Sequence, residues 1–158
     1  LPEEQPKSGA GWKAWGKRLA TVAHAMREEG FAFGWHNHDF EFVKLKDGSF
    51  PIERIFDGGP LLDWECDIAW VAFARQNPVK WFKTYGERIT AVHLKDNAKP
   101  GENADQQGQT DVGAGVLKWP EIFAALKNTR TLHYVVEHDN PKDVWSFARN
   151  SFKFVSKM

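Results

Sequence analysis

The sequence of 158 residues contains a single cysteine, Cys66, so an internal disulfide is excluded. It also lacks net charge, because 21 lysines and arginines balance 21 aspartates and glutamates. A chain without an overall positive field does not attract a phosphate backbone. We therefore expect no nucleic-acid partner.

Long apolar runs are missing as well. No stretch approaches the roughly 20 apolar residues of a membrane span, and no signal-peptide pattern opens the chain. We expect no membrane partner and a cytoplasmic location, with the periplasm as the alternative because we expect the natural start to be missing. Aromatic residues are abundant instead: they make up 14% of the chain, include eight tryptophans and provide ample material for a core.

Four segments have the composition of short strands, and each ends in two polar residues separated by one position. The segments are residues 31–38, 62–67, 89–95 and 132–139. The pairs are His36 and His38, Glu65 and Asp67, His93 and Lys95, and Glu137 and Asp139. Because side chains alternate along a strand, the two members of a pair share a face. This pattern predicts a converging ligand set at one end of a sheet.

Helix-like stretches separate these strands. The helical spacing of apolar residues predicts helices over residues 12–29, 78–85 and 119–126 and a final helix from Asn140 towards Met158. The final helix has an expected buried stripe of Val144, Phe147, Ser151, Phe152 and Val155. Strands that alternate with helices predict an α/β fold with a parallel sheet and right-handed crossovers.

Two segments are less regular. Residues 43–60 predict a turn at 46–48 and a short helix at 52–56. Residues 97–115 are rich in Gly, Asn, Gln and Asp and follow a strand end, so we expect a loop over the polar rim of the sheet.

The length is short for a closed barrel of this kind. Eight strand–helix units usually need about 250 residues, whereas this chain has 158, contains four such units and begins with Leu1. We expect residues 1–158 to form one domain that is half of a barrel. It would be completed by another chain, as in a homo-oligomer, or be a fragment that lacks its N-terminal half. A half-barrel leaves two sheet edges unpaired.

Five motifs occur in a characteristic order along the chain. They are WHNHDFEF at residues 35–42, WECD at 64–67, RITAVHLKD at 88–96, VGAG at 112–115 and VEHD at 136–139. Together they resemble the sugar phosphate isomerase/epimerase family, whose fold is the xylose isomerase-like TIM (β/α) barrel. The resemblance runs from about residue 12 to 151 and matches strands five to eight, the later half of that barrel.

The resemblance implies one divalent metal ion at the carboxyl end of the barrel. The family binds it with an acid on strand five, an Asp on strand six, a His on strand seven and a Glu on strand eight. The last three correspond to Asp67, His93 and Glu137, and His36 stands where many relatives have Glu. A site of two imidazoles and two carboxylates suits Mn, Zn, Fe or Co better than Ca.

The implied activity is that of a divalent-metal-dependent sugar or sugar phosphate isomerase/epimerase. It would act on a small sugar-like substrate through a metal-stabilised enediolate. Glu137 or Glu65 would move the proton, and Lys95 would neutralise developing negative charge or bind a substrate carboxylate or phosphate.

Three further residues, His38, Glu41 and Asp139, are expected to contact substrate or support the ligands. The family's epimerases use two metal-bound glutamates on opposite faces of the sugar as paired acid and base. With His36 in place of one glutamate, isomerisation or dehydration is favoured over two-sided epimerisation.

Several alternatives stay open. Lys95 and Asp96 can instead form an ion pair that caps a strand, and residues 113–115 can form either a plain turn or a phosphate-binding loop. A sugar or cyclitol dehydratase of the same fold is another enzyme class. A hydrolase of the endonuclease IV type needs more metal ligands and a DNA substrate, which the neutral charge disfavours. The remaining alternative is a non-catalytic half-barrel that needs a partner chain.

Overall fold

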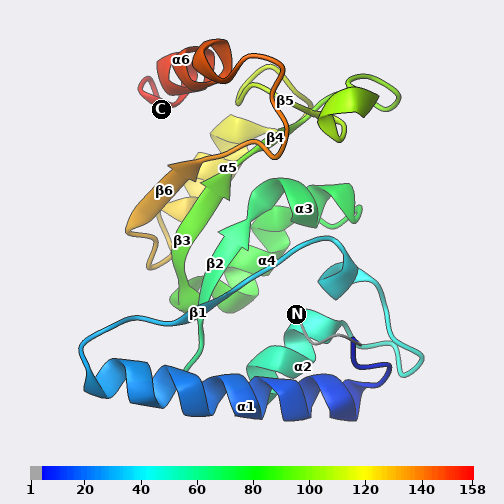
Figure 1. The fold of residues 1–158 in the computed structure, drawn as a ribbon, viewed down its shortest axis with the longest axis vertical. Coiled ribbons are helices and arrows are strands. Elements are labelled where there is room, and N and C mark those ends of the chain that lie inside the picture. The colour runs from blue at the N-terminus through cyan, green and yellow to red at the C-terminus, as the bar shows by residue number, and fades with distance from the viewer. Residues whose placement is uncertain (1–4) are drawn as a thin grey trace.

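A four-stranded parallel sheet forms the centre of the protein. The computed structural model describes residues 5–158. The strands are β1 (Gly34–His36), β2 (Asp63–Asp67), β3 (Ile89–Leu94) and β6 (His133–Val136), in the spatial order β1-β2-β3-β6. In Figure 1 the arrows of β2, β3 and β6 point towards the end of the molecule where α6 (Val144–Val155) lies. The predicted α/β fold with parallel pairing is confirmed.

The remaining elements alternate with these strands. The other helices are α1 (Gly9–Glu28), α2 (Pro51–Gly58), α3 (Ile68–Phe73), α4 (Pro78–Tyr85) and α5 (Trp119–Leu126). Short 3-10 helices are η1 (Phe40–Phe42), η2 (Gly86–Arg88) and η3 (Ala104–Gln106). Strands β4 (Asp96–Asn97) and β5 (Gln109–Thr110) pair in antiparallel fashion. Apart from Asp96, they lie within residues 97–115, which the sequence predicts to be a loop.

Proline and asparagine set the bounds of the well-predicted helices. Both α4 and α5 match the predicted ranges, and each has a proline in its first turn, where the missing N–H costs no hydrogen bond. The Asn77 side chain also accepts a hydrogen bond from the Val79 N–H at 3.0 Å and caps α4. Just beyond α1, Gly30 has a φ of 82°, a conformation that favours glycine.

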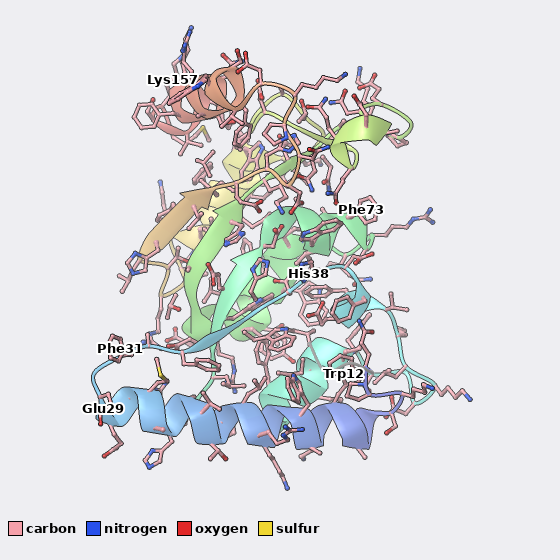
Figure 2. The ribbon with its side chains drawn as sticks, viewed as in Figure 1. Trp12, Glu29, Phe31, His38, Phe73 and Lys157 are labelled. Carbon is pink, nitrogen blue, oxygen red and sulfur yellow. The ribbon has the colours of Figure 1, made fainter. Side chains whose placement is uncertain are left out.

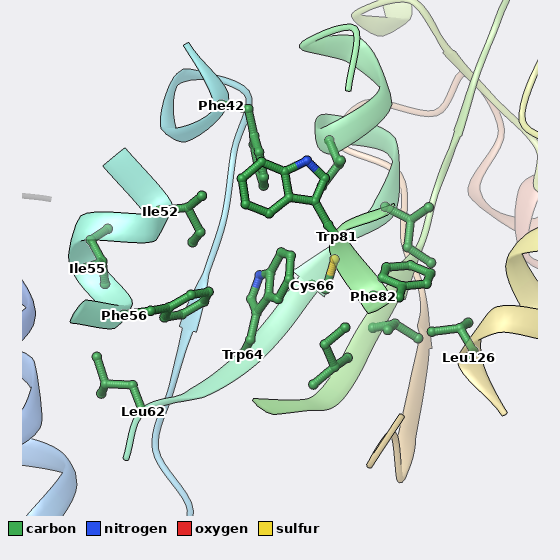
Figure 3. Packing of buried hydrophobic residues seen from close by; sticks show 14 of the residues in the cluster. Phe42, Ile52, Ile55, Phe56, Leu62, Trp64, Cys66, Trp81, Phe82 and Leu126 are labelled. Atoms are coloured by element: carbon green, nitrogen blue, oxygen red, sulfur yellow. The ribbon is translucent and has the colours of Figure 1, made fainter. Parts of the chain in front are cut away.

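The hydrophobic core lies on one face of the sheet. Figure 3 shows Trp64 and Cys66 of β2 packed among side chains of α2 and α4. Val92 and Leu94 of β3 are equally buried on this face. The alternate positions of β2 and β3 carry Glu65, Asp67 and His93. The predicted alternation is therefore confirmed, and it directs the charged side chains to the opposite face of the sheet.

All four predicted strands are longer than the observed ones, the first and the last by the most. Residues 31–33 lie outside β1, and residues 137–139 lie beyond the end of β6. His38 therefore reaches the site from a loop. Because the chain leaves the sheet after His36, strand alternation no longer fixes the direction of that side chain.

The prediction for the final helix is wrong in its start and in part of its stripe. The Asp143 carboxylate caps α6 by accepting from the N–H groups of Trp145 and Ser146, so the helix begins at Val144 and not near Asn140. Val144 is 61% exposed and Phe152 is 69% exposed. Periodicity identifies an apolar stripe, and neighbouring elements bury Phe147 and Ser151 and partly cover Val155, but they leave Val144 and Phe152 exposed.

The final strand is also an exposed edge of the sheet. Leu132 and Tyr134 are exposed there, and Trp145 of α6 is exposed beyond it. Among residues 5–158, no helix is both long and apolar enough to cross a bilayer.

Candidate metal and active site

Three side chains converge where the strands end. His36 closes β1, Asp67 closes β2, and His93 lies opposite Asp67 in the register of β2 and β3. One ligand atom from each of these residues lies within 4.8 Å of the others. We call His36, Asp67 and His93 the ligand triad. The parallel register produces this convergence, because it brings the carboxyl ends of neighbouring strands to one edge.

The triad has the properties of a metal site. Two of its nitrogens, His36 Nδ1 and His93 Nδ1, are buried and make no hydrogen bond. The buried Asp67 Oδ2 contacts the Lys95 ammonium at 3.1 Å. Buried polar atoms in proteins nearly always have a partner, so two unpartnered nitrogens beside a carboxylate indicate room for a ligand. Two imidazoles and a carboxylate are donors that Zn, Mn, Fe and Co accept. The residues present therefore fit the divalent metal that the family resemblance implies.

Burial also favours the neutral form of the His36 imidazole, which is the form that binds a metal ion. Burial, followed by repulsion from His93, lowers the pKa of His36 to about 4. The imidazole is therefore neutral near pH 7, and a neutral ring keeps the lone pair that a metal ion needs.

The two oxygens of Asp67 have different partners. Its Oδ1 accepts a hydrogen bond from the Trp70 N–H at 3.0 Å and caps α3. Its Oδ2 lies 3.8 Å from His93 Nδ1 and 3.1 Å from Lys95 Nζ. One short side chain thus starts a helix and supplies a candidate ligand atom.

Glu65 contacts the far side of the His93 ring. Its Oε1 lies 2.9 Å from His93 Nε2, whereas Nδ1 of the same ring is buried and makes no hydrogen bond. A carboxylate on the second nitrogen of a ligating histidine fixes the ring's orientation and raises its basicity. This geometry gives Glu65 a supporting position beside the triad, and its predicted role in proton transfer stays a prediction.

Glu137 lies next to the triad without joining it. Its Oε2 is 3.4 Å from His93 Nδ1 and only 2.6 Å from Lys95 Nζ. The closest partner of this carboxylate is therefore the lysine. Its predicted roles as metal ligand and as base both stay predictions.

Lys95 is buried among carboxylates. Its side chain is only 2% exposed, and its Nζ lies 2.8 Å from Asp139 Oδ2, in addition to the contacts with Asp67 and Glu137. Burial lowers the pKa of Lys95, but the attraction of these carboxylates outweighs burial and leaves the pKa above its ordinary value. Lys95 is thus held as a cation. The alternative pairing of Lys95 with Asp96 is wrong, because Lys95 pairs with Asp67, Glu137 and Asp139.

Asp139 is fixed by a residue that the sequence did not point to. Gln109 of β5 donates to the Asp139 carboxylate from its Nε2, and its Oε1 accepts from the Asp139 N–H at 2.9 Å. Burial raises the pKa of Asp139, but the hydrogen bonds from Gln109 and Lys95 outweigh burial and leave the pKa below its ordinary value. A buried Gln in a predicted loop gives no signal in the sequence until β4 and β5 are known to pair.

His38 lies beside the triad, and Glu41 is bonded to the backbone of His38. The His38 ring centroid is 5.2 Å from that of His36 and 5.9 Å from that of Trp70, and Figure 2 shows His38 on the segment that follows β1. Glu41 is fully buried, and its oxygens accept from the His38 N–H at 2.8 Å and from the Trp35 indole at 2.9 Å. Substrate contacts by His38, Glu41 and Asp139 stay predictions.

Asn37 is a second residue that sequence reasoning missed. Asn37 is fully buried and stands between His36 and His38 in the sequence. Its Oδ1 accepts from the Trp64 indole at 2.8 Å and from the Asp67 N–H at 3.0 Å, while its Nδ2 donates to the Asp67 carbonyl at 3.2 Å. Asn37 thus joins the end of β1 to the end of β2. The only available signal was a polar residue on the apolar face of a predicted strand.

The glycine-containing loop after β5 is held by Asp96. This fully buried carboxylate accepts from the N–H groups of Gly113 and Gly115 at 2.9 and 3.2 Å, and also from Leu117 N–H and the Trp119 indole. The N–H groups that a phosphate would need at residues 113 and 115 are therefore bonded to the protein. This observation favours the plain turn over the phosphate-binding loop.

Comparison by sequence gives one curated relative of low identity. No protein-family model matches the chain. The rhizopine catabolism protein MocC of Rhizobium meliloti is 25% identical over 134 residues, which cover 77% of this chain and 40% of that protein.

Comparison by structure is more extensive. A sugar phosphate isomerase/epimerase from Parabacteroides distasonis has a TM-score of 0.81 at 21% identity, over 98% of this chain and 54% of its own. The probable 3-DHS dehydratase AsbF of Bacillus anthracis has a TM-score of 0.72 at 11% identity, over 94% of this chain and 58% of its own. A xylose isomerase domain protein and an L-ribulose 3-epimerase share the fold as well.

These findings define the class of protein. The chain has an α/β fold with a parallel sheet that resembles the xylose isomerase-like TIM barrels, and it carries a candidate metal site at the carboxyl ends of its strands. The predicted resemblance to the sugar phosphate isomerase/epimerase family is confirmed at the level of the fold. The chain spans 40% of the curated relative and little more than half of the solved structures.

Proposed function

We propose that this chain is the later half of a xylose isomerase-like barrel whose complete form is a divalent-metal-dependent sugar or sugar phosphate isomerase/epimerase. The observation that carries the proposal is the ligand triad, with two buried imidazole nitrogens that make no hydrogen bond and a buried carboxylate at the carboxyl ends of neighbouring parallel strands. The carboxyl end is where barrels of this architecture hold their active sites. The shared fold with a sugar phosphate isomerase/epimerase supports the reaction class.

The triad would hold Mn, Zn, Fe or Co through His36, Asp67 and His93. When bound, such an ion polarises a substrate carbonyl, acidifies the neighbouring C–H and stabilises an enediolate. Glu65 would keep the His93 ring in its ligating orientation through the 2.9 Å contact at Nε2.

Glu137 is the carboxylate best placed to move the proton. It lies beside the triad and is partly exposed, so it borders both the ligands and the open face of the sheet. A hollow of about 380 Å³ on this face is lined by Glu65 of the site and by Ala32, Gly34, Asp63, Thr90, Ala91, His133 and Val135.

The half-barrel is part of the proposal because both outer strands of the sheet lack a neighbour among residues 5–158. The chain also aligns with little more than half of each solved structure. The missing strands would come from the N-terminal half of a longer polypeptide or from another copy in a homo-oligomer. Either source would close the pocket around the open face.

A dehydratase is the second candidate, and the fold shared with a probable dehydratase favours it. Dehydration of a hydroxy carbonyl compound begins with the same removal of a proton next to a carbonyl. The two candidates therefore need the same ligands and base, and they differ in whether a hydroxyl group leaves.

The proposal is tested by hydrogen exchange between substrate and solvent. The purified protein with Mn²⁺ or Co²⁺ is incubated in D₂O with a panel of ketoses and ketose phosphates, and deuterium incorporation is followed by NMR. Glu137→Gln is expected to slow the exchange by about 10³, because a positioned base contributes roughly 10² to 10⁴ in rate. Loss of a hydroxyl group in the product identifies a dehydratase.

The matched control is Glu121→Gln on the exposed surface of α5, where the carboxylate pairs only with Lys118. This variant is expected to exchange at the rate of the parent protein. A protein that binds the metal but exchanges no sugar hydrogen, with or without the missing half supplied, contradicts the enzymatic proposal. That outcome favours the non-catalytic half-barrel.

A further inference from the structure

Lys95 neutralises part of the carboxylate cluster in the metal-free protein. The whole residue is only 1% exposed, and burial of an isolated ammonium is costly. Its Nζ offsets this cost through contacts with Asp67 Oδ2 at 3.1 Å, Glu137 Oε2 at 2.6 Å and Asp139 Oδ2 at 2.8 Å. The Trp70 ring lies 5.3 Å from the same atom and adds a cation–π contact.

The contacts of Lys95 overlap with the predicted ligand set. Asp67 belongs to the triad, and Glu137 is the predicted fourth ligand, yet the Glu137 oxygen lies 2.6 Å from the lysine and outside the triad. An ammonium and a divalent cation repel each other, and both are attracted to the carboxylate oxygens of Asp67 and Glu137. The Glu137 carboxylate therefore cannot bind the ammonium and the metal ion equally strongly at the same time.

We propose that Lys95 is an internal counter-ion that competes with the divalent metal for Asp67 and Glu137, and thereby sets the affinity of the site. The inference rests on the proposed function, because it requires the triad to bind metal. In the structure Lys95 takes the same Glu137 oxygen that lies 3.4 Å from His93 of the triad. In the metal-loaded protein Asp139 remains as the partner of Lys95, fixed in place by Gln109.

The arrangement explains why Asp139 is bonded so fully. Its N–H and its carboxylate are both held by Gln109, so the carboxylate stays on Lys95 when other partners leave. A lysine that kept no anion would be left buried and uncompensated, a state that proteins avoid.

The test measures metal affinity and thermal stability, and neither readout depends on turnover. Lys95→Met removes the charge at similar length, Lys95→Arg retains it, and Lys118→Met removes the charge of an exposed lysine as the matched control. Mn²⁺ and Co²⁺ binding are measured by calorimetry, and unfolding temperatures are measured with and without metal.

Lys95→Met is expected to bind Mn²⁺ about tenfold or more tightly than the parent, because a cation beside the site has been removed. Its metal-free form is expected to melt earlier, and its gain in melting temperature on adding metal is expected to be larger. Lys118→Met is expected to stay within about threefold of the parent affinity, and Lys95→Arg, which retains the charge, is expected to show no gain in affinity. A folded Lys95→Met that binds metal no more tightly than the parent overturns the inference.

A second variant decides the case if Lys95→Met does not fold in either condition. Asp139→Asn removes the anion that retains Lys95, so the lysine is expected to hold Glu137 and Asp67 more strongly and to weaken metal binding. Unchanged or tighter binding in that variant overturns the inference. A parent protein that binds neither Mn²⁺ nor Co²⁺ refutes the metal site of the proposed function itself, a result distinct from equal binding by parent and variant.

Discussion

Replacement of Asn37 by alanine is expected to cost far more than a single hydrogen bond. The substitution leaves the Trp64 indole N–H, the Asp67 N–H and the Asp67 carbonyl without their partner in a fully buried setting. Each unsatisfied buried group costs about 1–3 kcal/mol. Partial relaxation of β1 against β2 recovers some of this cost, so we expect a loss of about 4 kcal/mol in the free energy of unfolding.

The measurement is urea unfolding of the metal-free protein, with the m-value as the check that only stability has changed. Trp64→Phe removes one of the three bonded groups and is expected to cost about 1 kcal/mol from the lost hydrogen bond, in addition to the cost of the cavity that the smaller ring leaves in the core. In the double variant the two costs are expected to overlap by about 1 kcal/mol, because the indole N–H is counted in both. A loss below about 1 kcal/mol for Asn37→Ala, or strict additivity of the two changes, would refute the reasoning.

Two further predictions concern buried carboxylates outside the triad. Burial raises the pKa of Glu41 from 4.5 to about 7, so the folded state binds its proton more tightly than the unfolded state does. Its contribution to stability is full below pH 4.5 and is lost as the pH rises through about 7. The total loss in the free energy of unfolding is about 3 kcal/mol. In urea unfolding, the midpoint of the parent protein should therefore fall between pH 4.5 and 7 by more than the midpoint of Glu41→Gln, which has no carboxyl group to titrate. Asp96→Ala removes the acceptor of four donors. Chemical denaturation should show a loss of at least about 3 kcal/mol in the free energy of unfolding. A loss near zero would mean that the conformation of residues 97–117 does not depend on Asp96.

Strand alternation predicts the core of the site correctly. Residues two apart share a face, and parallel strands end at one edge, so the sequence alone predicts that polar pairs at the ends of β1, β2 and β3 converge. His36, Asp67 and His93 do lie together. The placement of Glu137 needed the structure, because Lys95 determines where that carboxylate lies and strand alternation does not.

The helix α3 shows why another part was missed. Its residues 68–73 are almost all apolar, so they show no amphipathic period, and the capping residue Asp67 looks like the end of a strand. Asn37 and Gln109 escaped notice for a related reason. Their importance comes from hydrogen bonds to residues about 30 positions away, and no local pattern reports such contacts.

The divided use of the Asp67 carboxylate restricts which residues this position can accept. Oδ1 caps the N-terminus of α3 and Oδ2 lies beside His93, so the short aspartate side chain must place both oxygens at once. Asparagine would retain the helix cap and lose the negative charge. Glutamate would retain the charge, but its extra methylene group displaces both oxygens. The two most conservative replacements of Asp67 therefore each lose one of its two functions. Substitution at this position is restricted by the helix cap as much as by the metal site.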